Sequence, residues 1–480
     1  MKKQLLLIIA SLGFSTLFYK QDFGLNMLLF AFFSIALVSY FHPAAIKRKE
    51  YWVTAFLYLA SASFVFTNNS ALSIVNTFLT FLVFVGSVSG IKNSVYVQWF
   101  NGLYQTFMGS LHQKIHRDSK TKVIVRPHTY YDFKFILLSL IIVISLVAVF
   151  SSLYSKANPI FEQGLAAIDL SFINISWILF SVMGYLLLNN ITATAELDIM
   201  TTSEREIDTL LKENTLSEKQ QQRLQKENRL GILVMLTLNA LILLFICTDV
   251  IYVLQNPLDN GIALSKTVHD GVNALVTSIV IAIILILILF RGDINFYKNN
   301  RNLKTLTFIW IGLNVIIILI TAYKNYLYSS GFGLTYKRIG VFIYLLLCIS
   351  GMVTTYFKVA KRYGLYVMFR INARVAFMVM VIVGSFSWDR TITRFNLEQV
   401  AQPDMEYLYH MSYHNGDLLH TYAKQPDGQS EVQPPKNLNH DKIQNRYERW
   451  QGVLSKETWQ SKTLNGLLNN PTYEKSEISN

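Results

Sequence analysis

The sequence predicts an all-α fold, a polytopic transmembrane helix bundle of about 11 spans with a small helical tail at its C-terminal end. Two observations indicate this fold class. Hydrophobic residues make up 52% of the 480 residues and charged residues only 15%, whereas soluble domains carry about a quarter charged residues. The apolar residues also gather in long runs, and a run of about 20 residues is what a helix needs to cross a bilayer.

Apolar runs of suitable length follow one another along most of the chain. They lie near residues 4–19, 24–41, 51–67, 71–89, 134–154, 169–188, 230–254, 271–290, 305–322, 339–356 and 371–387. The run 271–290 is the clearest, and 4–19, 51–67 and 371–387 are the shortest or most interrupted. The first run follows two lysines, as in a signal peptide, but the lack of a small-residue cleavage site favours a retained span.

The distribution of Lys and Arg predicts the orientation of these spans. With a cytoplasmic N-terminus, 27 of the 43 basic residues fall in cytoplasmic segments, and only Lys20, Lys156, Lys266, Lys324, Lys337 and Arg338 fall in outer loops. Basic residues favour the cytoplasmic side, and an odd number of spans then places the tail outside. Because topology accounts for the net charge of +13, no nucleic-acid partner is expected.

One basic stretch stands directly before the fifth run. It contains Lys114, Arg117, Lys120, Lys122 and Arg126. Basic residues beside a span also attract anionic lipid headgroups. The sequence therefore offers two interpretations, a topology signal alone or a contact with anionic lipid.

The order of the runs predicts four regions in a multi-pass protein of the bacterial cytoplasmic membrane. An N-terminal membrane bundle at 1–190 holds about six spans, and a C-terminal bundle at 230–387 holds about five. The tail covers 388–480, with helical spacing of apolar residues in 397–422 and 447–468 around a polar stretch at 424–439. The oligomeric state is not predicted.

The remaining region, at 191–229, is a charged cytoplasmic connector with a helical pattern. Ser203 with Glu206, and Ser217 with Gln220, have the spacing of capping boxes, which predicts two helix starts. A helical hairpin that contacts a second copy or a partner is one interpretation. A solvated connector is the other.

Several polar residues interrupt the spans. Asp249 falls near the outer end of the run 230–254, where it indicates either an ion path or an interfacial position. Asn239 and Asn314 lie in mid-span and predict hydrogen bonds between helices rather than substrate contacts. Arg370 and Arg374 precede the last run one turn apart, where they either reach the headgroups or bind phosphate.

The candidates for metal or cofactor chemistry are few. His410 and His414 in the tail have the spacing of two ligands on one helix face, and Asp417 is near. The sequence has no Glu after the first His, so it lacks the zinc-protease motif. A pair of surface histidines is the simpler interpretation, and neither a cofactor nor a disulfide between Cys247 and Cys348 is expected.

Several short elements of the C-terminal half occur in a characteristic order. Gly333-Leu334-Thr335-Tyr336-Lys337-Arg338 leads into a span, and Trp388-Asp389-Arg390-Thr391-Ile392-Thr393-Arg394-Phe395-Asn396-Leu397 follows the last one. Asp404-Met405-Glu406-Tyr407-Leu408 and Trp459-Gln460-Ser461 come after these. Over residues 230–470 this order resembles an uncharacterised bacterial membrane family, domain of unknown function 4173, with domain of unknown function 4153 as a near relative.

The resemblance implies an architecture but no activity, substrate or metal site. Thr393 and Phe395 depart from the family pattern, which has Ala and Tyr around Arg394. The shared elements single out Thr335, Arg338, Arg394 and Asn396 as positions where the loop 323–338 meets the tail. We hypothesise that Arg338 or Arg394 joins the loop to the tail through backbone carbonyls or Asp389.

The function that these features favour is structural, regulatory or signalling work at the cell envelope by an integral membrane protein. The alternative is a transporter of a small solute or lipid, which would need Asp249, Asn239 and Asn314 to converge on a cavity. A membrane-bound enzyme is the least favoured class, because few His, Asp or Glu residues fall in the spans.

Overall fold

The computed structural model describes residues 2–89, 94–120, 133–161, 174–193, 195, 197, 200–202, 204, 209–213, 215, 217–255, 275, 277–424 and 438–469. These residues form α-helices and two 3-10 turns, and among them β pairing is limited to one isolated bridge. The all-α prediction is confirmed. The chain divides into two compact units, Met1–Lys20 with Phe107–Ala195 and Gln21–Thr106 with Glu196–Asn480.

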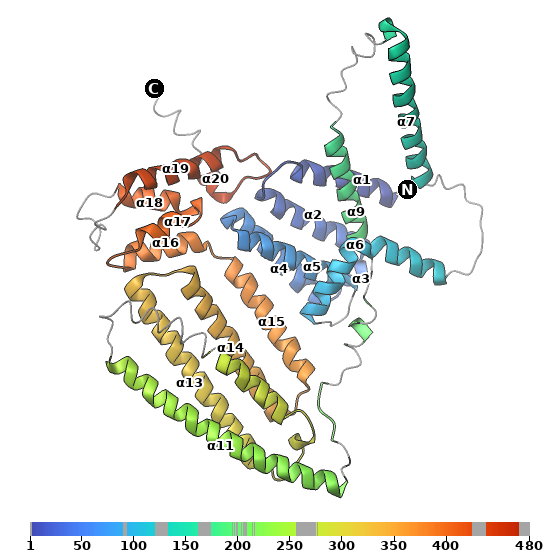
Figure 1. The fold of residues 1–480 in the computed structure, drawn as a ribbon. Coiled ribbons are helices and arrows are strands. Elements are labelled where there is room, and N and C mark those ends of the chain that lie inside the picture. Colours follow the sequence, from blue (N-terminus) through green and yellow to red (C-terminus); the bar gives the residue numbers. More distant parts are fainter. Residues whose placement is uncertain are drawn as a thin grey trace. The chain divides into compact units, whose positions relative to one another are not determined.

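The first unit is built around the pair α1 (Lys2–Phe18) and α9 (Ile175–Ile191), and it also holds α7 (Phe133–Ala157) (Figure 1). The Ser15 and Ser181 hydroxyls hydrogen-bond at 2.7 Å between α1 and α9. A Cβ on Gly184 would lie 2.5 Å from the Phe14 ring. The two helices therefore pack closely through small residues, as membrane helices commonly do.

The second unit begins with α2 (Leu25–Phe41), α3 (Pro43–Ile46), α4 (Lys49–Asn68), α5 (Ala71–Ser89) and the start of α6 (Val95–Lys120). The α4 helix packs against both α2 and α5. Glycines allow α5 and α6 to approach backbone to backbone, because a Cβ on Gly86 would lie 1.8 Å from the Gln98 carbonyl oxygen. A Cβ on Gly102 would lie equally close to the Leu82 carbonyl oxygen.

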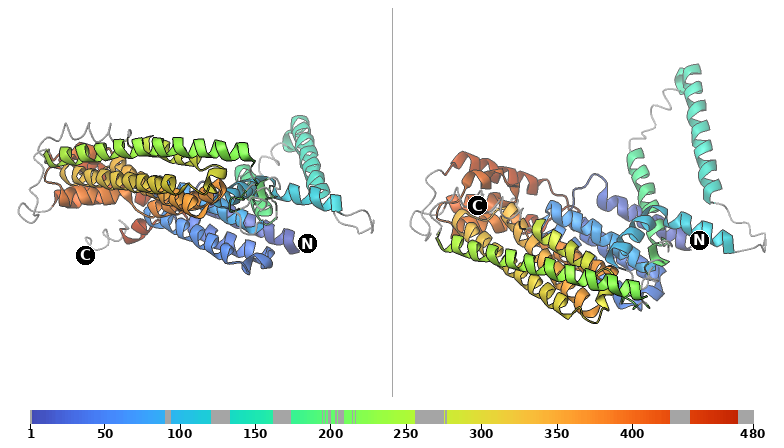
Figure 2. Two further views of the ribbon diagram at one scale, coloured as in Figure 1. Left: turned by 90° about the horizontal axis from the view of Figure 1, so that it is seen from below. Right: turned by 60° about the horizontal axis from the view of Figure 1, so that its bottom comes forward.

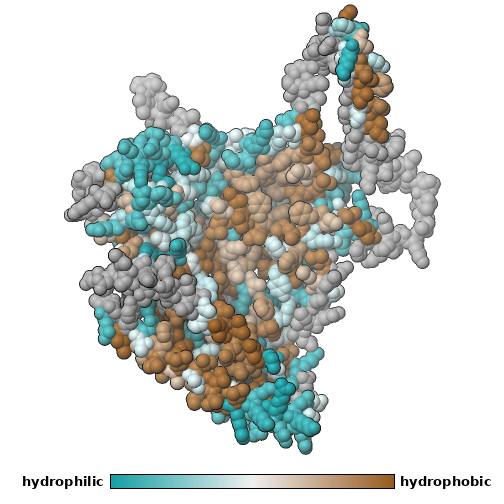
Figure 3. All heavy atoms as spheres, in the orientation of Figure 1, coloured by the Kyte–Doolittle hydropathy of each residue, from teal (hydrophilic) through white to brown (hydrophobic). Residues whose placement is uncertain are grey.

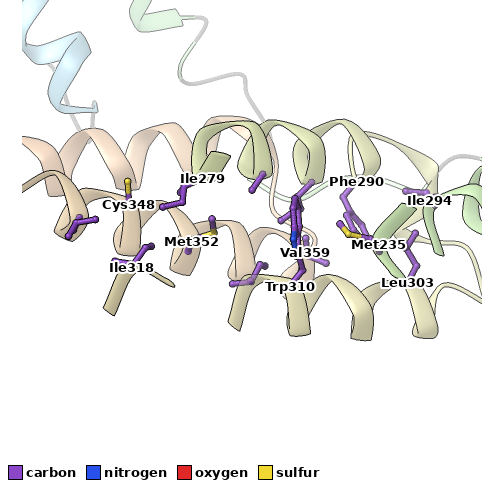
Figure 4. Packing of buried hydrophobic residues seen from close by; sticks show 14 of the residues in the cluster. Met235, Ile279, Phe290, Ile294, Leu303, Trp310, Ile318, Cys348, Met352 and Val359 are labelled. Atoms are coloured by element: carbon purple, nitrogen blue, oxygen red, sulfur yellow. The ribbon is translucent and has the colours of Figure 1, made fainter. Parts of the chain in front are cut away.

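The C-terminal bundle consists of α11 (Glu218–Gln255), the helix Thr277–Leu289, the turn η1 (Asp293–Asn295), α13 (Arg301–Phe332), α14 (Tyr336–Lys361) and α15 (Leu365–Gly384). Figure 2 shows α11 lying along α13 in both views. A cluster of buried hydrophobic residues, which we call the apolar cluster, packs between the helices of this bundle. Its members include Met235, Ile279, Phe290, Leu303, Trp310, Ile318 and Met352 (Figure 4).

The outward faces of this bundle are apolar as well. Leu233, Leu236 and Leu244 on α11 are 56–63% exposed. Figure 3 shows apolar residues gathered over the bundle, with hydrophilic residues at the first turns of α11 and over the C-terminal helices. Helices that are apolar all round require either a large protein core or lipid around them.

The span prediction is confirmed in its coarser form. Each apolar run is helical over most of its described residues. Among those residues, five helices are long and apolar enough to cross a membrane, namely Ala71–Val88, Glu218–Ile251, Arg301–Phe332, Tyr336–Lys361 and Leu365–Gly384. The count of about 11 and the orientation stay predictions.

The connector before α11 takes a form that the sequence did not predict. Gln220 Oε1 accepts hydrogen bonds from Ser217 N at 2.9 Å and from the Ser217 hydroxyl at 3.1 Å, which gives one half of the predicted second capping box. That box starts α11 itself, which continues into a span, so no separate second helix forms there. Leu211 N donates to Arg362 O at 3.0 Å, and Ser203 and Glu206 lie outside the described residues.

The tail folds into short helices. These are α16 (Trp388–Gln399), α17 (Met405–His410), the turn η2 (Tyr413–Asn415), α18 (Gly416–Ala423), α19 (His440–Ser455) and α20 (Leu464–Leu468). Their core contains Ile392, Leu408, Leu419 and Ile443, and Ile339 of α14 packs into the same cluster. The tail therefore shares a hydrophobic core with the start of a candidate span.

Candidate functional site

The loop between α13 and α14 meets the tail at a site that we call the loop–tail junction, formed by Gly333–Tyr336, Arg338, Asp389, Asn396, Tyr407 and Ser412. The chain turns at Gly333, whose φ is 85° and ψ 162°, a region open essentially to glycine alone. A Cβ there would also lie 2.9 Å from Asn396 Oδ1. Gly333 is thus required by its backbone and by its neighbour.

Asn396 holds the loop by both ends of its side-chain amide. Its Oδ1 accepts from Leu334 N at 2.5 Å, and its Nδ2 donates to Leu334 O at 3.0 Å. The side chain is 2% exposed. A buried amide that pairs with both backbone polar groups of one residue fixes the loop against α16 without placing a charge there.

Asp389 forms a second link between loop and tail. Its Oδ1 accepts from the Tyr336 hydroxyl at 2.7 Å, and its Oδ2 accepts from the Ser412 hydroxyl. Tyr336 N in turn donates to the Tyr407 hydroxyl at 3.1 Å. The first residue of α14 therefore bonds to both α16 and α17, and Asp389 extends the link to Ser412.

Thr335 and Arg338 stabilise the loop itself. The Thr335 hydroxyl accepts from Arg338 N at 3.3 Å and caps the start of α14. The Arg338 guanidinium donates to the carbonyls of Phe332 and Gly333 and lies 3.9 Å from the Tyr328 ring centre. Arg338 thus bonds backbone carbonyls as hypothesised, but these carbonyls belong to the loop and not to the tail.

Arg394 does not take part in the junction. Its side chain is 65% exposed and lies 3.8 Å from Glu398 on the same helix. The structure brings Thr335, Arg338 and Asn396 together and leaves Arg394 on the outer face of α16. The hypothesis that Arg394 joins loop and tail is wrong, because the buried face of α16 carries Asp389, Thr393 and Asn396.

The tail side of the junction is held by two arginines. Arg390 donates to both carboxylate oxygens of Asp417 at 2.8 Å. Arg446 of α19 donates to the carbonyls of Tyr409, Met411 and Ser412. The sequence did not reveal the role of Arg446, because its partners lie 34–37 residues earlier in the chain and no local pattern marks them.

The late Trp459-Gln460-Ser461 element closes the tail onto the start of α2. Leu25 N donates to Lys462 O at 2.9 Å, and Asn26 N donates to Gln460 O at 2.7 Å. A Cβ on Gly24 would lie 2.2 Å from Ser461 O. Two segments from opposite ends of the chain therefore pair through their backbones, a contact that the sequence does not reveal.

The histidines are separated by a break in the helix. His410 ends α17, whereas His414 lies in η2 after an extended residue. His414 is half-buried, and this burial lowers its pKa below the ordinary value. Among the described residues no group of three metal-binding side chains is present. The metal interpretation of His410 and His414 depended on one continuous helix, and the two residues do not share one.

Asp249 has a partner on the neighbouring helix. Its carboxylate pairs with the ammonium group of Lys324 on α13, and the two side chains are 13% and 20% exposed. Asn239 Nδ2 donates across to Leu306 O at 3.0 Å, whereas Asn314 Nδ2 donates to Trp310 O of its own helix. The interhelical bond predicted for Asn239 is present, and that for Asn314 is replaced by a local one.

The other basic candidates are less informative. Arg370 is half-buried and Arg374 is exposed near the start of α15. Lys114 is exposed on α6, while the side chains of Arg117, Lys120, Lys122 and Arg126 lie outside the described residues. The proposed contact of this stretch with anionic lipid therefore stays a prediction.

The fold and the junction define a class of protein, an all-helical chain with several helices suited to a membrane and a helical tail bonded to one of them. The chain belongs to the family described as domain of unknown function DUF4153, whose model matches residues 6–421. The sequence resemblance named this family as the near relative, so the assignment to domain of unknown function 4173 is not confirmed, and the match begins far earlier than residue 230. No curated protein and no solved structure matches the chain.

Proposed function

We propose that this protein is a structural or regulatory component of a bacterial cytoplasmic membrane, in which the C-terminal tail and the membrane bundle act as one coupled unit. The observation that carries the proposal is the double hydrogen bond of Asn396 to Leu334. It fixes the tail to the turn that starts α14. A change imposed on the tail would therefore reach the bundle through this helix.

The orientation follows from the charge distribution. About 11 spans with a cytoplasmic N-terminus place the tail and the junction outside the membrane. Labelling of single cysteines in intact cells tests this, with Ser455→Cys on α19 and Lys298→Cys in the loop before α13, both exposed positions. A membrane-impermeant maleimide should label the first at once and the second only after permeabilisation. The reverse order would contradict the orientation.

Coupling is tested at a native reporter. Cys348 on α14 is buried and free, whereas Cys247 on α11 is exposed and free. If the junction controls the packing of α14, Asn396→Ala should raise the rate at which a membrane-permeable maleimide labels Cys348, with Cys247 as internal reference. Arg394→Ala, on the exposed face of α16, is the matched control and should leave the rate unchanged. An unchanged Cys348 rate in both variants would refute coupling.

The transporter alternative has less support from the geometry. Asp249 and Asn239 are ten residues apart on α11, about 15 Å along the helix axis at 1.5 Å per residue. Lys324 and Asn314 on α13 are separated by a similar distance. These polar groups therefore bond at different positions along the helix axes, and buried hydrophobic residues pack between the helices, so the polar groups do not converge on one binding site.

A further inference from the structure

Three cations converge on one short segment at the end of the bundle remote from the junction. Lys358 Nζ of α14 donates to Phe290 O at 2.8 Å, and Lys304 Nζ of α13 approaches Asn295 O at 3.4 Å. The guanidinium of Arg362, directly after α14, lies 4.8 Å from the Phe296 ring centre. We call Lys304, Lys358 and Arg362 the basic end of the bundle.

The segment that they contact supplies little negative charge. Between residues 290 and 301 the acid is Asp293, against the further cations Arg291, Lys298 and Arg301. Lys358 is only 3% exposed, and the next residue, Val359, belongs to the apolar cluster together with Phe290 (Figure 4). An ammonium group removed from water in apolar surroundings is costly unless an anion or several acceptors compensate it.

Arg362 occupies a backbone position that favours another residue. It caps α14 in the left-handed region, with φ 57° and ψ 37°, where glycine is the usual residue. The connector fixes the same turn, because Leu211 N donates to Arg362 O and Gly364 N donates to Thr209 O. An arginine held there directs a charge at the end of the apolar cluster, where the headgroup layer of a membrane would begin.

We propose that Arg362 and Lys304, the exposed and half-buried members of the basic end, bind the phosphate of an anionic phospholipid headgroup, while the buried Lys358 adds its charge from below. Lysine and arginine pair with phosphate through charge-assisted hydrogen bonds, and basic pockets between membrane helices are suited to such headgroups. The inference rests on the proposed membrane location but not on the orientation or on coupling through the junction.

The test uses the full-length protein in a neutral detergent. Added phosphatidylglycerol should raise the midpoint of thermal unfolding by several degrees, whereas phosphatidylcholine and inorganic phosphate should not. Arg362→Gly removes the charge and suits the backbone, so its fold should persist while the apparent affinity for phosphatidylglycerol falls at least tenfold. Lys304→Gln gives a second, independent variant with the same expected loss.

The matched control is Lys298→Gln, which removes an exposed positive charge from the same segment. It should keep the response to phosphatidylglycerol. An equal loss in all three variants would mean that only bulk charge matters and would overturn the site. An equal response to inorganic phosphate would overturn the lipid as its source, and no response of the unaltered protein would overturn the proposal. Labelling at Ser455→Cys and Cys348 tests the proposed function separately.

Discussion

The two ends of α14 are fixed by opposite means. At Tyr336 the helix is held by neutral amides and hydroxyls and by one carboxylate, all of which find partners. At Lys358 and Arg362 it is surrounded by cations that bond to single carbonyls or to a ring. The first end is completed by the protein's own tail, whereas the second gathers three cations, for which we propose an anionic lipid as partner.

The largest effect that tests this contrast is expected at Gly333. Gly333→Ala would force a side chain into a glycine-only backbone region and against Asn396. We expect a loss of about 3 kcal/mol in the free energy of unfolding, measured by denaturant titration in micelles. Gly340→Ala, where a Cβ meets nothing within 4 Å, should lose none. Similar values for both variants would contradict a closely packed junction.

Asn396→Ala should have the next largest effect. It leaves the half-buried N–H and C=O of Leu334 without their partner, which costs about 2 kcal/mol. Limited proteolysis should then cut the tail faster than in the unaltered protein. Arg394→Ala removes only an exposed pair on the same helix and should cost less than about 0.5 kcal/mol. Equal protease sensitivity of the two variants would count against the amide as the main link.

Thr335→Ala should cost about 1 kcal/mol, because it removes the side-chain cap from the start of α14. Thr335→Ser retains the hydroxyl and should retain most of the stability. Thermal unfolding of the two variants in the same detergent distinguishes the cap from simple packing of the threonine methyl group.

The other end of α14 should respond in the opposite direction. Arg362→Gly relieves the left-handed backbone, so without anionic lipid it should raise the free energy of unfolding by about 0.5–1 kcal/mol. With phosphatidylglycerol present, the unaltered protein should regain this difference. A lower stability of Arg362→Gly in neutral detergent would show that the arginine supports the fold through its own contacts.

The smallest expected effect is the pH dependence of the free energy of unfolding that His414, on the tail side of the junction, produces. Burial lowers the pKa of His414, although Asp389 and Asp417 oppose the shift and Arg390 adds to it. The folded protein therefore binds a proton less readily than the unfolded chain. The free energy of unfolding should therefore be independent of this histidine above about pH 6.5, the ordinary histidine pKa. It should decline as the pH falls below that value. His414→Gln should reduce the decline, to which His420 also contributes because burial lowers its pKa as well. His410→Gln, an exposed change, should preserve it.

Part of the junction was predictable from short sequence elements. Thr335, Arg338 and Asn396 were singled out by these elements, and the structure brings them together. Arg394 was singled out on the same grounds and lies outside the junction, because the elements do not reveal which face of α16 is buried. Asp389, Tyr336 and Ser412 form the second link through contacts 23 and 53 residues apart, which no local pattern encodes.

The sequence by itself determined the helical class, because runs of apolar residues can satisfy their backbone within lipid only as helices or closed barrels. It also determined the start of α11, since a capping box is a contact between neighbours in the chain. Only the tertiary structure decided that Asp249 pairs with Lys324, that Trp459-Gln460-Ser461 meets the start of α2, and that three cations share one segment. These contacts join residues far apart in the chain, and their energies depend on distances that composition and spacing do not contain.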